Sequence, residues 1–192
     1  MLAIFKREFK SYFQNVIGWL FVAALLAVYG LYFYVYNLKN GYPYISYNLK
    51  GIGFIMMIAV PILTMRSLSD EKKTKTDQLM LTSPVSVGRI VAGKYLAMAA
   101  VYTIDIALFA LSPLVLSIYG KVALSEAYVA LFGYWLYGLS CIAVGLFISS
   151  ISESVIISAI LTFAALFLSY MMQSITGLIS SSGNLLTKVL NC

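Results

Sequence analysis

Few residues of this sequence could do chemistry, and most of them lie in one short stretch. The 192 residues include 13 basic and 7 acidic side chains, and seven of these charges fall between residues 66 and 77, within and just before SDEKKTKTDQLMLTSP (69–84). The absence of histidine excludes Ser-His and Cys-His catalysis and histidine zinc sites. Cys141 and Cys192 form no disulfide or metal pattern, and no phosphate-binding loop is present. We therefore predict no catalytic residue, metal site or cofactor on this chain.

One further acid stands inside an apolar run. Asp105 follows Gly93 by twelve residues, about 18 Å along a helix, and an ionised carboxylate near mid-bilayer costs about 2.5–3.5 kcal/mol. We expect Asp105 to face other helices or water, with Tyr102 one turn away as a hydrogen-bond donor. Two interpretations stay open: a polar element of a translocation path or dimer interface, or a structural hydrogen bond between helices.

The elements that must position these residues are membrane helices. The chain is 61% hydrophobic and 10% charged, with a mean hydropathy of +0.91, whereas soluble domains carry roughly 25% charged residues. The sequence therefore predicts an all-α polytopic membrane protein, in one domain over residues 1–192, with an interfacial elbow helix and five spans. The surplus of basic residues indicates orientation in a bilayer and no nucleic-acid partner.

Helical periodicity gives the order of the elements. Residues 1–15 form an amphipathic, basic elbow helix with Phe5, Phe9 and Phe13 on one face, typical of a helix that lies in the membrane interface. A signal peptide is the disfavoured alternative, because the following run has the length of a full span. The spans are expected at 16–36, 48–66 (with a kink at Pro61), 95–119, 127–149 and 154–172, and small residues in the last two (Gly133, Gly138, Gly145, Ala159, Ala164) favour close packing.

Lysine and arginine counts near the span ends predict the orientation. With the N-terminus in the cytoplasm, nine basic residues lie inside (Lys6, Arg7, Lys10, Arg66, Lys72, Lys73, Lys75, Arg89, Lys94) and four outside (Lys39, Lys50, Lys121, Lys188). This places the charged stretch 69–84 in the cytoplasm of a cell, at its plasma membrane. The tyrosine-rich run 29–47 is then an aromatic belt at the outer surface or, as a sharper alternative, an outer lip that handles amphipathic substrate.

The charged stretch has the pattern of a docking device. Asp77 can cap a short helix over QLMLTS, which Pro84 would end, so that Leu79, Met80 and Leu81 project beyond the bilayer. Exposed apolar residues rimmed by charge usually mark a protein contact, although the same residues could fold back onto the membrane.

Residues 61–97, PILTMRSLSDEKKTKTDQLMLTSPVSVGRIVAGKYLA, resemble the permease subunits of ABC-2 type ATP-binding-cassette transporters, and within them the gliding-motility-type branch. The matching positions are Pro61, Thr64, Met65, Arg66, Glu71, Thr76, Leu79, Leu81, Thr82, Pro84, Gly93 and Lys94, and Lys75 stands where the family usually has glycine. FKREFKSYF (5–13) is similar to the family's elbow helix, and LFISSISESVIISAI (146–160) to its second cytoplasmic turn.

The resemblance implies that segment 71–84 is a coupling helix seated in a groove of a separate ATPase subunit. Leu79, Met80 and Leu81 would anchor it, while Glu71, Lys72, Lys73 and Asp77 would fix its register. Glu153, in the turn before the fifth span, would make a secondary ATPase contact, and Ser152 would cap that span. The resemblance further implies a second permease copy, identical or paralogous, and ATP with Mg²⁺ bound by the partner alone.

The family normally has six spans, whereas five are expected here. Residues 173–192 are too polar to cross the membrane and are expected to begin an outer segment that is cut short. The chain would then be a fragment, or another chain would supply the last span. The predicted function is that of a transport subunit, most simply an exporter. Two alternatives stay open: a membrane interaction or immunity-type protein that does not transport, and an ion-coupled carrier that uses Asp105.

Overall fold

The structure is a computed structural model that describes residues 2–42, 44–65, 67–69, 87–119 and 123–190. Throughout these residues the regular elements are helical, as the sequence predicts. They are α1 (Leu2–Gln14), α2 (Val16–Tyr32), the π-helix η1 (Phe33–Lys39), α3 (Ser46–Thr64), α6 (Val87–Phe109), α7 (Ser112–Tyr119), α8 (Leu124–Ile151) and α9 (Val155–Leu190). The expected coupling segment, residues 71–84, lies outside the described residues.

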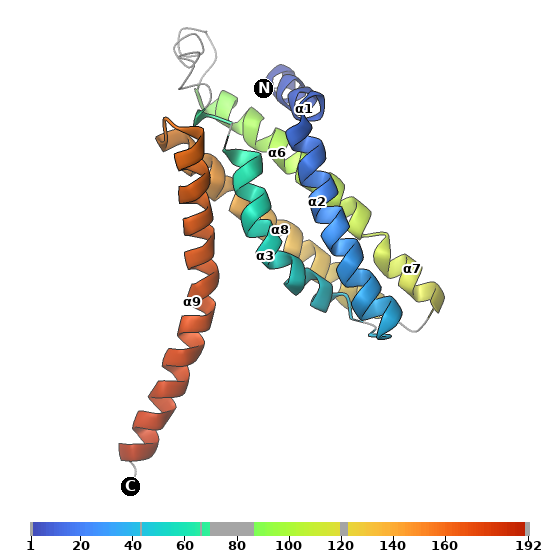
Figure 1. Cartoon of the computed structure of the whole chain (residues 1–192), viewed down its shortest axis with the longest axis vertical. Helices are drawn as coiled ribbons and strands as arrows, with labels where there is room; N and C mark the ends of the chain where they lie inside the picture. The colour runs from blue at the N-terminus through green and yellow to red at the C-terminus, as the bar shows by residue number, and fades with distance from the viewer. Residues whose placement is uncertain (1, 43, 66, 70–86, 120–122, 191–192) are drawn as a thin grey trace.

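Five helical stretches are long and apolar enough to cross a membrane, and this confirms the polytopic all-α fold. They are Val16–Lys39, Ser46–Thr64, Val87–Ile118, Leu124–Ile151 and Val155–Met172. Figure 1 shows α2, α3, α6 and α8 side by side as a bundle, with α1 across one end and α9 diverging from the others toward the C-terminus. We call the end that carries α1 and the start of α6 the α1 end, and the opposite end, which carries α7, the α7 end.

Large apolar side chains fill the space between α2, α3, α6 and α8. The centre of this core consists of side chains that are almost fully buried (Phe21, Leu25, Ile52, Met56, Val60, Met98, Tyr102, Ile142). Between α2 and α6, the Tyr29 ring stacks on Phe109 with 4.1 Å between ring centroids. The outward side chains are apolar as well, with Trp19, Phe132 and Ile160 each at least 59% exposed, as expected where lipid is the solvent.

The third span differs from the expected uninterrupted helix. It begins at Val87, stops at Phe109 and resumes as α7 from Ser112, with a turn at residues 110–111. Pro113 explains the break, since proline lacks an N–H and disfavours a helical conformation in the preceding residue, but is well suited to a first helical turn. The Ser112 hydroxyl donates to the Phe109 carbonyl at 2.7 Å and so satisfies one of the carbonyls freed at the end of α6.

Pro61 does not interrupt the second span. The α3 helix runs through it to Thr64, and the Met65 N–H donates to the Pro61 carbonyl at 2.8 Å. The expected kink stays a prediction.

The last helix is longer than expected. The candidate span itself ends at Met172, and the helix α9 continues beyond it without interruption to Leu190, which gives it 36 residues. At 1.5 Å per residue this is about 54 Å, well beyond the roughly 30 Å of a bilayer core. Residues 173–190 are therefore a helical extension of the fifth span.

Candidate functional site

The elbow helix α1 packs against the start of α6. Its aromatic face is ordered as a ladder: Phe5 stacks on Phe9 with 5.8 Å between centroids, and Phe9 meets Phe13 at 5.0 Å. Phe9 and Phe13 pack against the core of the bundle, so this face is covered by protein as well as turned to the interface. The basic residues on the other face, Lys6 and Lys10, are exposed.

Ile4, which breaks the amphipathic pattern of α1, has a structural role. It lies directly against Gly93 of α6, where an added Cβ would come within 2.9 Å of the Ile4 side chain. Glycine at this position therefore lets α1 and α6 approach closely, which accounts for the glycine of the Gly-Lys pair at 93–94.

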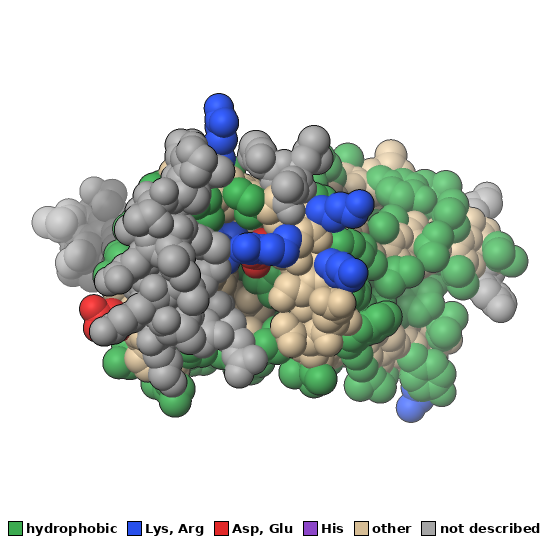
Figure 2. Space-filling model, turned by 90° about the horizontal axis from the view of Figure 1, so that it is seen from above, with side chains coloured by type: hydrophobic (Ala, Val, Ile, Leu, Met, Phe, Trp, Pro, Cys, Tyr) green, Lys and Arg blue, Asp and Glu red, His purple; other side chains and the backbone are tan. Residues whose placement is uncertain are grey.

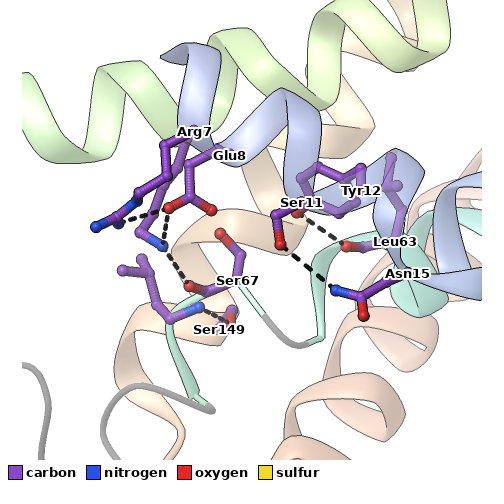
Figure 3. Close-up of polar contacts among 10 residues, drawn as sticks. Arg7, Glu8, Ser11, Tyr12, Asn15, Leu63, Ser67 and Ser149 are labelled. Atoms are coloured by element: carbon purple, nitrogen blue, oxygen red, sulfur yellow. Dashed lines mark hydrogen bonds and ion pairs between the residues drawn. The ribbon is translucent and has the colours of Figure 1, made fainter. Parts of the chain in front are cut away.

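Lys94 is the centre of a polar network that we call the α1-end junction. Its side chain is only 2% exposed, and its Nζ lies 3.5 Å from Oε1 of Glu8 on α1. The same nitrogen donates to the Ser67 carbonyl at 3.0 Å. Glu8 Oε1 also accepts from Nη2 of Arg7 at 2.8 Å, so the carboxylate is shared by two cations (Figure 3). The ion pair thereby joins α1 and α6 to the segment that leaves α3.

Ser149, near the end of α8, completes the α1-end junction. Its fully buried Oγ accepts two backbone hydrogen bonds, from Leu68 N at 3.2 Å and from Ser69 N at 3.3 Å. The hydroxyl of Ser69 in turn donates to the Met65 carbonyl. Segment 67–69 is therefore fixed to α8 by its amides and to α6 by the Ser67 carbonyl.

A close helix crossing supports these bonds. Gly145 of α8 faces Thr64 of α3, and a Cβ added at Gly145 would lie 2.9 Å from the Thr64 Cγ2. On the α1 side, the Tyr12 hydroxyl lies 3.5 Å from the Leu63 carbonyl and donates to it (Figure 3). The end of α3 is thus held between α1 and α8.

The junction surrounds both places where the described chain meets residues 70–86. Ser69 is the last described residue before that segment, and Val87, two turns before Lys94, is the first after it. Figure 2 views the α1 end and shows Lys and Arg side chains gathered around a partly covered acidic side chain. Any force applied to residues 70–86 therefore reaches α3 and α6 at positions already linked to α1 and α8.

The expected coupling residues Glu71, Thr76, Asp77, Leu79, Met80, Leu81, Thr82 and Pro84 lie outside the described residues. Glu153 is described, and it is exposed in the turn between α8 and α9, at the α1 end. Ser152 does not act as the expected cap: its buried Oγ has no hydrogen-bond partner among the described residues.

The intramembrane polar pair is arranged differently from the expectation. The Tyr102 hydroxyl donates its hydrogen bond to the Tyr134 carbonyl of α8 at 2.8 Å and not to Asp105. Gly138 makes this possible, because its missing side chain leaves the space that the Tyr102 ring occupies. Asp105 itself is fully buried, and neither of its carboxylate oxygens has a hydrogen-bond partner in the part of the chain that the structure describes.

Glu8 was missed by sequence reasoning, although a signal was present. It is the one acid before Asp70, and it stands beside three basic residues on the elbow helix (Lys6, Arg7, Lys10). A single acid on a basic helix that lies near the lysine opening another span is a candidate ion-pair partner.

Residues 31–191 match the family described as ABC-2 family transporter protein. This match covers most of the chain. The chain belongs to the ABC-2 transporter family. No curated protein and no solved structure matches it.

Membership makes the chain a permease-type, multi-pass membrane component of an ABC transporter. The gliding-motility branch stays a prediction. Among the described residues no group of three or more His, Cys, Asp or Glu side chains could hold a metal ion.

Proposed function

We propose that the chain is the membrane-spanning subunit through which a separate ATPase drives export of a substrate across the plasma membrane. Residues 71–84 dock in a groove of that ATPase, which binds ATP and Mg²⁺. A second permease copy, identical or paralogous, completes the transport path. The N-terminus and the α1 end face the cytoplasm.

The α1-end junction is the observation that carries this proposal. A coupling segment transmits force only if both of its ends are attached to the helices that must move. Ser149 attaches the chain before residue 70, while Lys94, through Glu8 and Ser67, attaches the helix after residue 86. The Lys94 contacts are buried and charge-assisted and are worth about 1.5–3 kcal/mol each, the neutral bonds to Ser149 about 0.5–1.5 kcal/mol each, and exposed ion pairs only about 0–1 kcal/mol.

Charge supports the orientation. Among the described residues, the exposed basic side chains Lys6, Arg7, Lys10 and Arg89 lie at the α1 end, and Lys39 and Lys50 lie toward the α7 end. The end with more Lys and Arg faces the cytoplasm under the positive-inside rule.

Docking is tested by changing Leu79 and Leu81 together to Asp and measuring co-purification with the ATPase subunit. The proposal predicts loss of the complex, because two carboxylates would replace the apolar anchors. Leu124→Asp serves as the control, since this exposed leucine opens α8 at the opposite end. Undiminished binding of the double variant would count against the proposal.

Orientation is tested with Lys73→Cys in a chain whose Cys141 and Cys192 are replaced by Ala and Ser. A membrane-impermeant maleimide should label this cysteine in inverted vesicles and not in intact cells. Labelling from the outside of intact cells would reverse the topology and remove the proposed contact with a cytoplasmic ATPase.

A further inference from the structure

A second polar feature lies away from the α1-end junction. A cavity of about 650 Å³ opens between α3, α8 and α9, lined by the polar side chains of Lys50, Tyr134, Tyr137, Ser169 and Tyr170 among others. Leu49, Ala130 and two glycines form the rest of its wall. This volume is in the range of small-molecule sites, and the mixture of apolar wall and a few polar groups is typical of them.

Lys50 gives this cavity its charge. Of the described residues that line it, Lys50 alone is charged, and no ion pair of its ammonium with a described carboxylate is present. It lies one turn inside the α3 span, since the helix begins at Ser46. Its side chain is exposed and belongs to the cavity wall, so its ammonium is accessible to an anion in the cavity.

The Tyr134 hydroxyl is an unsatisfied polar group of a cavity-wall residue. It is buried, and within the described chain it has no hydrogen-bond partner, although it belongs to a residue of the cavity wall. An unsatisfied hydroxyl in an apolar surrounding costs several kcal/mol. An oxyanion in the cavity would meet the Lys50 ammonium. The Tyr134 hydroxyl has almost no accessible surface, so it would donate to the same oxyanion only after the Tyr134 ring shifts toward the cavity.

We propose that this cavity binds the anionic head group of an amphiphile whose alkyl chain stays in the bilayer. The cavity is bounded by helices that cross the membrane, Ser46–Thr64 and Val155–Met172, so a ligand with an apolar tail reaches it from the lipid phase. In Figure 1, α9 diverges from α3 and α8 toward the α7 end. The proposed binding site depends only on the cavity. The further step, that the bound amphiphile is the transported substrate, rests on the function proposed above.

The test uses the purified chain without an ATPase, in a neutral maltoside detergent, with dodecyl phosphate as the probe in calorimetric titration. Lys50→Gln should weaken binding by at least about tenfold, the loss expected for one charge-assisted contact. Lys50→Arg should stay within about threefold of the native chain, because it keeps the charge. Lys39→Gln is the matched control, an exposed lysine near the same end that does not line the cavity.

Tyr134→Phe provides an arm that does not depend on charge. The substitution removes a hydroxyl that has no hydrogen-bond partner among the described residues, so the melting temperature should not fall. Binding of dodecyl phosphate should weaken by about threefold or more. If Lys50→Gln prevents folding, this variant decides the question.

Three results would overturn the proposal. They are unchanged binding in Lys50→Gln and Tyr134→Phe, equal competition by dodecyltrimethylammonium, and binding of inorganic phosphate as tight as that of dodecyl phosphate, which would point to a free anion. None of them bears on ATPase docking, because the ATPase is absent, so failure here is distinguishable from failure of the proposed function.

Discussion

Replacing Ser149 by alanine tests the α1-end junction most directly. The Ser149 Oγ accepts hydrogen bonds from Leu68 N at 3.2 Å and Ser69 N at 3.3 Å. Alanine leaves both amides without this acceptor, and a buried, unsatisfied donor costs about 1–3 kcal/mol. Ser69 is fully buried, whereas Leu68 is half-buried and open to rescue by water, and both distances are slightly long for hydrogen bonds. We therefore expect a total loss of about 1–3 kcal/mol.

Ser140→Ala is the matched control on the same helix. Ser140 is exposed, and its hydroxyl donates only within α8, to the Leu136 carbonyl at 3.0 Å. Its replacement should change the free energy of unfolding by less than about 0.5 kcal/mol. Both variants are compared by equilibrium unfolding in mixed micelles, followed by circular dichroism at a helical wavelength.

The function proposed above adds a second readout for Ser149→Ala. The docking segment itself is unchanged, so the variant should still bind the ATPase, while transport per ATP hydrolysed should fall because segment 67–69 is no longer held to α8. Equal unfolding free energies for Ser149→Ala and Ser140→Ala would refute the structural reasoning. Loss of ATPase binding in the folded variant would refute the separation of docking from force transmission.

Three further predictions concern single buried positions. Lys94→Met should lower the free energy of unfolding by about 2 kcal/mol. This is less than the loss of about 3–5 kcal/mol typical of a broken buried ion pair, because Arg7 still neutralises Glu8. The control Arg89→Met, at an exposed position of the same helix, should change the free energy of unfolding little. Gly138→Ala should lower the melting temperature, at a cost of about 1–3 kcal/mol, because its methyl group would overlap the Tyr102 ring. Gly133→Ala, on the same helix with nothing within 4 Å, should be neutral or stabilising by up to about 1 kcal/mol. Asp105→Asn should leave ATP-driven transport in vesicles intact; transport that follows a proton gradient, ignores ATP and is lost in this variant would instead favour the ion-coupled carrier.

The elements of this fold could be predicted because lipid makes the pattern simple. A run of about 20 apolar residues has few alternatives to a spanning helix, and the amphipathic period of residues 2–14 has few alternatives to a surface helix. The structure adds detail that the pattern did not show where a single residue interrupts a helix or a helix continues past its span. Pro113 divides the third span, and α9 extends to Leu190 because a helix can continue through polar residues once it leaves the hydrocarbon core.

Partners across helices were harder to predict than the helices. Tyr102 and Asp105 are three residues apart, so periodicity correctly places them near one face of α6, and a local hydrogen bond was the simplest expectation. The choice of Tyr134 depends on Gly138 of α8, which lies at the crossing and admits the ring. Among the predicted small residues, Gly138 and Gly145 are confirmed as close contacts, whereas Gly133 faces open space. Sequence shows which residues are small but not which of them lies at a crossing.

The junction and the cavity share two helices, and this has a mechanical consequence. At the α1 end, α3 and α8 are fixed to each other by the Thr64–Gly145 contact and, just beyond it, by Ser149. At the other end of the same helices, Lys50 and Tyr134 line the cavity. A rotation imposed on α3 and α8 near residues 67–69 is therefore transmitted along both helices to the wall of the cavity. Since Ser169 and Tyr170 of α9 line the same cavity, an amphiphile bound there would contact α9 as well as the two helices of the junction.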